Sequence, residues 1–185
     1  MKTPILETER LILREMTRED YPALAAILQD AETMHAYEHA FSDEETRAWL
    51  ERQLRRYQED GFGLWAVVLR ETGRMIGQCG ITLQALDGNM APEIGYHFNR
   101  QFWHRGYAIE AAAACKRHAF TTLGFDEVHS IIRDTNLASI NVAIRNGMFA
   151  RRWFVKNYRG VDMTHIVFSA TDTATRGFKR GQTTG

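Results

Sequence analysis

Residues 101–108 read Gln-Phe-Trp-His-Arg-Gly-Tyr-Ala, and Ile109, Glu110 and a run of alanines follow at once. An apolar segment ends just before this stretch, at Phe98, and the alanines predict a helix just after it. A loop that leads into the first turn of a helix gathers several unpaired backbone N–H groups at one point, and such a point binds phosphate. We therefore expect residues 101–108 to hold the phosphates of a ligand.

A strand and two helices are predicted before the main sheet. Residues 10–16 alternate between apolar and polar side chains, which is typical of a strand. Thr17 is the expected N-cap of a first amphipathic helix. Ser42 and Glu45 form a capping box that begins a second helix, which ends near residues 60–61.

The rest of the chain alternates between strands and helices. We expect strands at 64–69, 75–83, 93–98, 128–132, 149–156 and 163–170, and helices from about 105 to 124 and from 136 to 145. Gly95 lies inside one expected strand, where a glycine often marks a bulge or a ligand close to the backbone. The order predicts one α+β domain over residues 1–170, built on a mixed, mostly antiparallel sheet flanked by helices. Residues 171–185 are rich in Thr, Gly and basic residues and are expected to be a disordered tail.

Composition narrows the function. The chain has 185 residues, with 23 Lys and Arg against 23 Asp and Glu, so no net charge attracts it to nucleic acid or to an anionic membrane. Its two cysteines, Cys79 and Cys115, lie in apolar segments without metal-ligand spacing, and no secretory leader or long apolar span is visible. We expect a cytoplasmic protein with free thiols. A buried disulfide between the two cysteines is the alternative.

Four blocks of sequence carry a family resemblance. The order of elements, with Gln101-x-x-His104-x-Gly106-Tyr107-Ala108 between a strand and a helix, resembles the GNAT superfamily of acyl-CoA-dependent N-acetyltransferases, whose pyrophosphate loop is Q/R-x-x-G-x-G/A. The block from Asn136 to Phe149 is similar to the asparagine-containing helix and Gly-Phe turn of that family. The opening residues 7–14 and Pro92 to Tyr96 resemble the RimJ/RimL-like branch, which includes ribosomal-protein alanine N-acetyltransferases. The resemblance covers the chain from about residue 6 to residue 170.

One position departs from the family pattern. His104 stands where the family has its first loop glycine. If the backbone there needs a positive φ, histidine costs about 1–2 kcal/mol. If the position supplies only an N–H group, nothing is lost, and the imidazole could add a phosphate contact.

The resemblance implies an enzyme that transfers an acetyl group from acetyl-CoA to a primary amine by direct attack, without a metal. The acceptor would be a protein N-terminal α-amine or a small-molecule amine. The residues expected to contact acetyl-CoA are Tyr96, His97, Phe98, Gln101, His104, Arg105, Gly106, Tyr107, Ala108, Asn136 and Asn141. For Asn136, helix capping is an alternative role.

The chemistry needs a neutral amine, a stabilised oxyanion and a proton for the departing thiolate. About 10% of an α-amine with a pKa near 8 is neutral at pH 7, against roughly 0.04% of a lysine amine. We favour Glu93 as the base, directly or through water, with Asp162 or a merely solvated Glu93 as alternatives, and we expect Glu93→Gln to lower kcat most at low pH. Ser139 resembles a serine that acts as general acid in this branch. Tyr158, or no catalytic duty for Ser139, is the alternative.

Residues 34–39 are the least regular part of the chain. Met34, His35 and Tyr37 are expected to form the wall of the acceptor pocket. The segment also matches H-x-x-E-H through His35, Glu38 and His39, so a zinc hydrolase is a remote alternative that would need a helix there. A non-catalytic acyl-CoA sensor is a second alternative, and the last strands could pair two copies as a homodimer.

Overall fold

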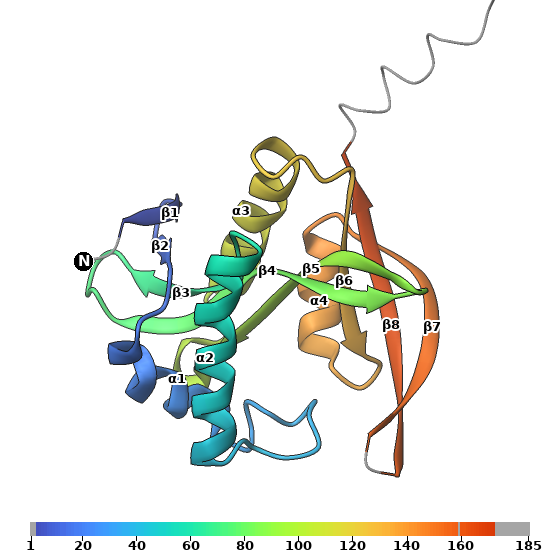
Figure 1. Ribbon diagram of the computed structural model, residues 1–185, viewed down its shortest axis with the longest axis horizontal. Coiled ribbons are helices and arrows are strands. Elements are labelled where there is room, and N and C mark those ends of the chain that lie inside the picture. The colour runs from blue at the N-terminus through green and yellow to red at the C-terminus, as the bar shows by residue number, and fades with distance from the viewer. Residues whose placement is uncertain (1–2, 159, 173–185) are drawn as a thin grey trace, which may run out of the picture.

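The computed structural model describes residues 3–158 and 160–172. From residue 173 onward, the tail expected from the sequence lies outside the described residues. One eight-stranded sheet organises the rest, in the order β1-β2-β3-β4-β5-β6-β8-β7 (Figure 1). Every pair of neighbouring strands is antiparallel except β5 and β6, which are parallel. The expected α+β fold with a mixed, mostly antiparallel sheet is therefore confirmed.

The elements follow the chain closely as the sequence predicts. The strands are β1 (Pro4–Glu7), β2 (Leu11–Arg14), β3 (Leu64–Leu69), β4 (Met75–Leu86), β5 (Asn89–Phe98), β6 (Glu127–Arg133), β7 (Phe149–Tyr158) and β8 (Val161–Thr171). The helices are α1 (Tyr21–Leu28), α2 (Asp43–Glu59), α3 (Tyr107–Thr121) and α4 (Leu137–Arg145), with short 3₁₀ helices η1 (Arg18–Asp20) and η2 (Arg100–Phe102). The Ser42–Glu45 capping box begins α2 as expected.

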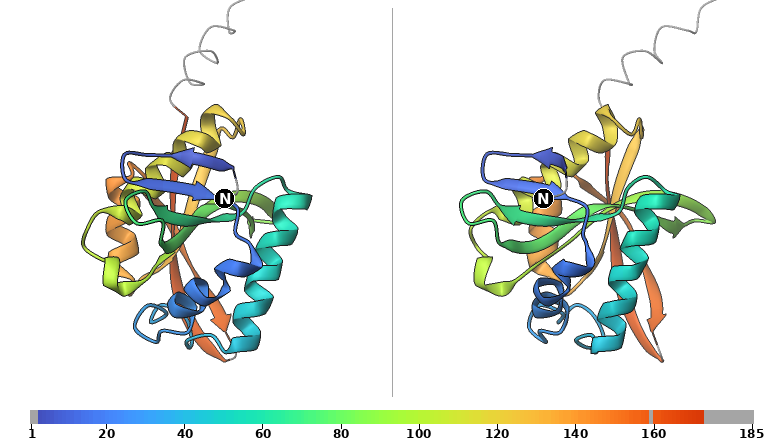
Figure 2. Two further views of the ribbon diagram at one scale, coloured as in Figure 1. Left: turned by 90° about the vertical axis from the view of Figure 1, so that its left-hand side faces the viewer. Right: turned by 60° about the vertical axis from the view of Figure 1, so that its left-hand side comes forward.

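The sheet separates two hydrophobic cores. Strand β3 is buried along its whole length, and its alternate residues face opposite sides. Leu64 and its alternate neighbours pack with α1 and α2, whereas Trp65 and its alternate neighbours pack with α3. Helices α2 and α3 therefore cover opposite faces of the sheet (Figures 1 and 2).

Strands β5 and β6 diverge at the centre of the sheet. They are joined by the crossover helix α3, and among the described residues their parallel ladder consists of the single pair Glu93–His129. The pairing of β5 with β4 is regular from Asn89 to Phe98, so the bulge considered at Gly95 is absent. Backbone groups on β5 lose their β6 partners because the strands separate, not because β5 bulges.

Strand β1 was not predicted from the sequence. It has four residues, of which only Leu6 is even partly buried, and it pairs at the edge of the sheet with β2. A short, exposed edge strand that includes Pro4 carries little periodic signal.

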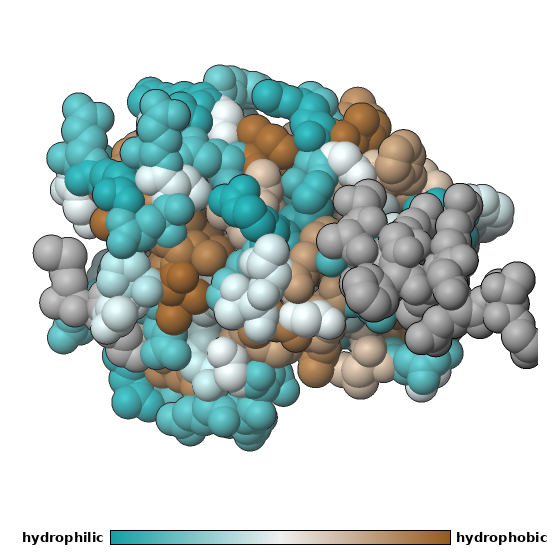
Figure 3. Space-filling view, turned by 90° about the horizontal axis from the view of Figure 1, so that it is seen from above, coloured by the Kyte–Doolittle hydropathy of each residue, from teal (hydrophilic) through white to brown (hydrophobic). Residues whose placement is uncertain are grey.

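The surface is mixed in character. Hydrophilic residues cover most of the face seen from above, and hydrophobic residues show between them in smaller groups (Figure 3). Large exposed apolar side chains include Phe149, Trp153 and Val155 on the edge strand β7. Within the described residues, no helix is both long and apolar enough to cross a membrane.

The two cysteines are free thiols, as predicted. Cys79 and Cys115 are buried, with their sulfur atoms 3.6 Å apart. The alternative of a disulfide between them does not hold in this structure, because a disulfide needs a sulfur–sulfur distance near 2.05 Å.

Candidate active site

A cavity of about 980 Å³ opens where β5 and β6 diverge. Its walls come from the segment before α2, from α2 itself, from β5 and β6, from the start of α3 and from α4. Of the sixteen residues predicted to act in catalysis, to contact acetyl-CoA or to form the acceptor pocket, thirteen line it: His35, Tyr37, Glu93, Tyr96, His97, Phe98, His104, Gly106, Tyr107, Ala108, Asn136, Ser139 and Asn141. Segments far apart in the chain thus meet at one place.

Three predicted contact residues do not line the cavity. Met34 is 1% exposed and packs in the core beside α1 and α2, so it is not part of the pocket wall. Gln101 and Arg105 are exposed, in η2 and in the turn before α3. We therefore remove Met34 from the candidate site, and contact of Gln101 and Arg105 with acetyl-CoA stays a prediction.

The loop before α3 has the geometry of an anion-binding turn. His104 and Gly106 both have positive φ values, +59° and +79°, and α3 begins at Tyr107. The first-turn residues Tyr107 and Ala108 line the cavity, and the first N–H groups of a helix have no intrahelical acceptors. The loop can therefore offer several donors to a pyrophosphate, while histidine at position 104 carries the strain considered from the sequence.

The β1–β2 hairpin braces this loop. Arg10 forms a salt bridge of 2.6 Å with Glu110 in the first turn of α3, and its Nη1 donates to the Arg105 carbonyl over 3.0 Å. Thr8 Oγ1 also donates to Glu110 over 2.6 Å. A residue of the first hairpin thus fixes the position of the loop some 95 residues later in the chain.

Replacing Arg10 with alanine is expected to weaken acetyl-CoA binding about fivefold and to leave the rate at saturating acetyl-CoA nearly unchanged. The loop loses its tether, so more conformational freedom is lost on binding. Isothermal titration with acetyl-CoA measures the effect. The control is Arg70→Ala in the turn after β3, because Arg70 contacts Glu7 and Thr8 of the same hairpin but not the loop before α3. Equal affinities for the two variants would contradict this role of Arg10.

Glu93 occupies the point where β5 and β6 separate. Its Oε1 accepts a hydrogen bond of 3.1 Å from the Ile131 N–H on β6. Burial raises the pKa of Glu93 from 4.5 to about 7, although the Ile131 N–H, Arg56 and Lys156 favour its ionised form. A carboxylate with a pKa near 7 can accept a proton at neutral pH and is a stronger base than an ordinary glutamate.

A hydrogen-bonded chain reaches the cavity wall from α2. Trp49 Nε1 donates to Gln78 Oε1 over 3.0 Å, so the Gln78 amide nitrogen faces His97 Nδ1 at 3.1 Å. His97 Nε2 then carries the hydrogen and donates to the Tyr37 hydroxyl over 2.8 Å. Burial lowers the pKa of His97 to about 4, so the ring is neutral. This series of hydrogen bonds holds the Tyr37 side chain at the wall of the predicted acceptor pocket.

Helix α4 contributes a second wall. The side chain of Asn136 accepts a hydrogen bond of 3.1 Å from the Ser139 N–H and caps α4, which is the alternative role considered for it. The Tyr96 hydroxyl donates to the Ser139 carbonyl over 3.0 Å and ties β5 to α4. Ser139 and Asn141 both line the cavity.

The geometry does not support the zinc alternative. Residues 31–36 form turns and residues 37–39 form bends, so the segment is not a helix. His35 Nδ1 lies 2.9 Å from the Glu32 carbonyl, and His39 Nε2 lies 3.0 Å from Glu45, so the two imidazoles have separate partners. In the described ranges, no group of three His, Cys, Asp or Glu side chains could hold a metal ion.

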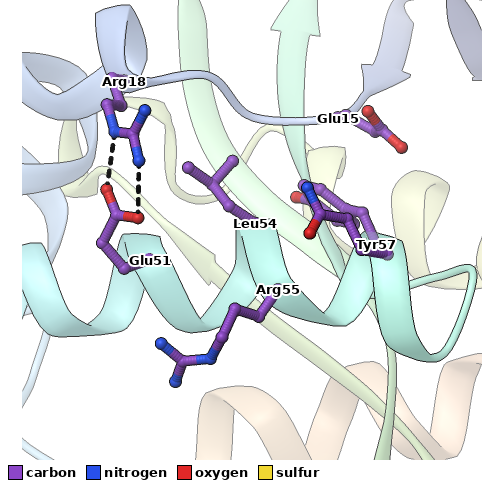
Figure 4. A pocket seen from close by; sticks show the side chains of 7 residues that line it. Glu15, Arg18, Glu51, Leu54, Arg55 and Tyr57 are labelled. Carbon is purple, nitrogen blue, oxygen red and sulfur yellow. Dashed lines mark hydrogen bonds and ion pairs between the residues drawn. The ribbon is translucent and has the colours of Figure 1, made fainter.

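A smaller hollow beside α2 does not contain any of the predicted site residues. It has a volume of about 330 Å³ and is lined in part by Glu51, Leu54 and Arg55. Two hydrogen bonds, of 2.8 and 3.0 Å, pair Glu51 with Arg18 (Figure 4). Arg18 and Glu51 neutralise each other in this ion pair, so the large cavity remains the candidate site.

The sequence did not indicate several residues of the cavity. The cavity is also lined by Arg52 and Arg56 on α2 and by Lys156 on β7. Gln78 orients His97 through a hydrogen bond. The spacing of Trp49, Arg52 and Arg56 does place them on one helical face, which was the available signal. On its own, a charged helical face indicates exposure to solvent and not a site.

The fold and this cavity agree with the acyltransferase class expected from the sequence, and comparison with known proteins identifies the family. Residues 10–149 match the acetyltransferase (GNAT) domain. The chain therefore belongs to the GNAT acetyltransferase family.

Among curated proteins, the chain is similar to the uncharacterized protein YkkB of Bacillus subtilis (strain 168), with 36% identity over 80% of this chain and 89% of YkkB. It is 30% identical to the uncharacterized N-acetyltransferase YoaA of the same organism, over 84% of this chain and 88% of YoaA. Both relatives span nearly the whole described domain.

Solved structures share the fold. An acetyltransferase from Agrobacterium tumefaciens matches with a TM-score of 0.78 and 28% identity, and the match covers 93% of this chain and 96% of the Agrobacterium chain. RimL, a ribosomal L7/L12 α-N-protein acetyltransferase solved in complex with coenzyme A, has a TM-score of 0.76 and 20% identity, covering 93% and 99%. At that identity, the similarity to RimL shows the common fold alone.

Proposed function

We propose that this protein transfers the acetyl group of acetyl-CoA to a primary amine by direct attack, with Glu93 as the general base. The observation that supports the proposal most strongly is the position of Glu93. Its half-buried carboxylate, with a pKa near 7, shares one cavity with the first turn of α3. This arrangement supports a reaction in which Glu93 and the loop before α3 act on two substrates that meet between β5 and β6.

The residues present fit acetyl-CoA as the co-substrate. The N–H groups at the start of α3 would hold its pyrophosphate, and the β5 backbone groups that lack β6 partners would bind its pantetheine arm. Backbone N–H groups near Gly95 would stabilise the oxyanion that develops on the thioester carbonyl.

The proton steps follow from the same geometry. Glu93 accepts a proton from the attacking amine, directly or through water, and the departing thiolate needs a proton donor. Ser139 lines the cavity and can supply that donor. The alternative proton donor is Tyr158, whose side chain lies outside the described part of the structure.

The acceptor pocket is bounded by Tyr37 and His35, on the same face of the sheet as α2. Either a protein N-terminus or a small amine fits the proposed chemistry. We further propose that residues 1–170 act as one catalytic domain in the cytoplasm and that β7, with its exposed Trp153, is the surface for a homodimer.

An acceptor panel tests the proposal. The purified protein is mixed with acetyl-CoA and amines of each class, and free thiol release is followed, with mass spectrometry to locate the acetyl group. Thiol release that requires an amine and yields its N-acetyl product is the expected result. Tight acetyl-CoA binding without turnover on any amine would instead favour the acyl-CoA sensor.

A further inference from the structure

Three cations share the large cavity with Glu93. Arg52 and Arg56 come from α2 and Lys156 from β7, and all three line the large cavity. Arg56 and Lys156 are close enough to Glu93 to favour its ionised form, and the pKa of Arg56 is lowered by burial and by the neighbouring Arg52. Like charges have been brought together here, and the nearby carboxylates of Asp60 and Glu93 do not offset the effects of burial and of Arg52 on the pKa of Arg56.

The two arginines are not used in ion pairs with the protein. Among the described residues, neither Arg52 nor Arg56 has a carboxylate oxygen within 4.0 Å. Arg52 lies over the Trp49 ring at 5.1 Å, and Arg56 Nη1 has a long contact of 3.5 Å with Gln53 Oε1. A half-buried arginine beside another arginine is costly unless an anion approaches it.

The phosphates of acetyl-CoA do not account for this cluster. The phosphate-binding loop leads into α3, and α2 and α3 cover opposite faces of the sheet. Of the other carboxylates in the cavity, Glu45 is bonded to His39 and to the Ser42 N–H, in the segment that begins α2. The cations therefore face the acceptor side of Glu93.

We propose that the acceptor is a small primary amine that also carries an anionic group, a carboxylate or a phosphate, which Arg56 and Arg52 bind while Glu93 faces the amine. This inference rests on the proposed acetyl transfer and specifies its substrate class. The arginine fork matches a carboxylate or a phosphate through paired N–H groups, and the cluster repels polyamines. The positive wall also raises the local concentration of an anionic acceptor.

Matched acceptors separate this substrate class from others. Amino acids are compared with their amides, and O-phosphoethanolamine with ethanolamine, each with acetyl-CoA at saturation. We expect kcat/KM to be at least tenfold higher for the anionic member of a pair. Of the two anionic probes, the better one identifies carboxylate or phosphate as the group that is recognised.

Variants on α2 tie the preference to the cluster. Arg56→Gln is expected to raise KM for the preferred anionic acceptor at least tenfold, with a much smaller effect on kcat and on the neutral member of the pair. Arg56→Lys keeps the charge and should recover part of the loss. Arg55→Gln is the matched control, because Arg55 is exposed on the same helix and lines the small hollow of Figure 4.

A further measurement separates recognition from a loss of folding. Removing Arg56 removes a charge that favours ionised Glu93, so the pH midpoint of kcat should move upward in Arg56→Gln and stay in place in Arg55→Gln. A wild-type preference for neutral amines, or equal KM changes for both members of a pair, would overturn the anionic-acceptor proposal while acetyl transfer stands. Thiol release from no amine at all would instead overturn the proposed function itself.

Discussion

Replacing Glu93 with glutamine is expected to lower kcat about 100-fold at pH 8, the size typical of a lost general base. The ratio of wild-type to variant rate should increase with pH through about 7 and then level off. Burial holds the pKa of Glu93 near 7, so below that pH the wild-type side chain is itself protonated and cannot accept a proton. Initial rates from about pH 5.5 to pH 9, with one acceptor at saturation, measure the ratio.

This pH dependence reverses the expectation from the sequence. A glutamate with an ordinary pKa would be ionised throughout, and its loss would matter most at low pH, where neutral amine is scarce. The structure buries the carboxylate between β5 and β6, and the titration of the base then dominates the profile. A ratio that does not change with pH would exclude Glu93 as the base.

The stability of Glu93→Gln provides an independent control. The pKa of Glu93 is higher in the folded chain than in the unfolded one, so folding favours the protonated form. Ionised Glu93 therefore destabilises the native state progressively from about pH 4.5 to pH 7, by on the order of 2 kcal/mol in a cavity open to water. Glutamine can still accept the Ile131 N–H bond, and the variant should gain thermal stability over wild type at pH 8 but not at pH 4.

Replacing Gly106 with valine is expected to raise the Kd for acetyl-CoA at least tenfold. Gly106 has a φ of +79°, and a left-handed conformation costs a side-chain-bearing residue about 1–2 kcal/mol, more when the side chain is β-branched. The loop would relax away from this conformation and move its N–H groups out of position, and 1.4 kcal/mol corresponds to a tenfold loss of affinity. Isothermal titration with acetyl-CoA measures the change.

Two matched variants separate loop geometry from general strain. Gly73 also has a positive φ, +69°, in the turn between β3 and β4, so Gly73→Val should lower the melting temperature without changing acetyl-CoA affinity. His104→Gly relieves a positive φ of +59° inside the loop and should bind acetyl-CoA at least as tightly as wild type. Unchanged affinity in Gly106→Val would remove the loop from the binding site.

Local patterns predicted most of the fold. The apolar run of β3 and the capping box of α2 appear where the sequence placed them, because burial periodicity and capping depend on neighbouring residues. Strand β1 was not predicted because it is short and exposed. Strand β5 begins earlier than predicted, at Asn89, because its first residues are exposed and do not alternate regularly between apolar and polar side chains.

The candidate site was predicted in outline. Glu93, His97 and Gly106 line the cavity, whereas Met34 is buried in the core. A methionine in an irregular segment gives no sequence signal of the direction in which its side chain points. Arg56 was missed for the opposite reason. Its charge predicted a solvent-exposed side chain, but in the folded chain Arg56 is half-buried and close to Glu93.

The sequence by itself determined the order of strands and α-helices from β2 onward, the family and the loop that begins α3, because each depends on residues that are close together in the chain. Only the tertiary structure decided the pKa of Glu93, the tautomer of His97 and the cations around the acceptor side. These properties depend on burial and on contacts between β5, β6, α2 and β7, and such contacts join residues that the chain separates by dozens of positions.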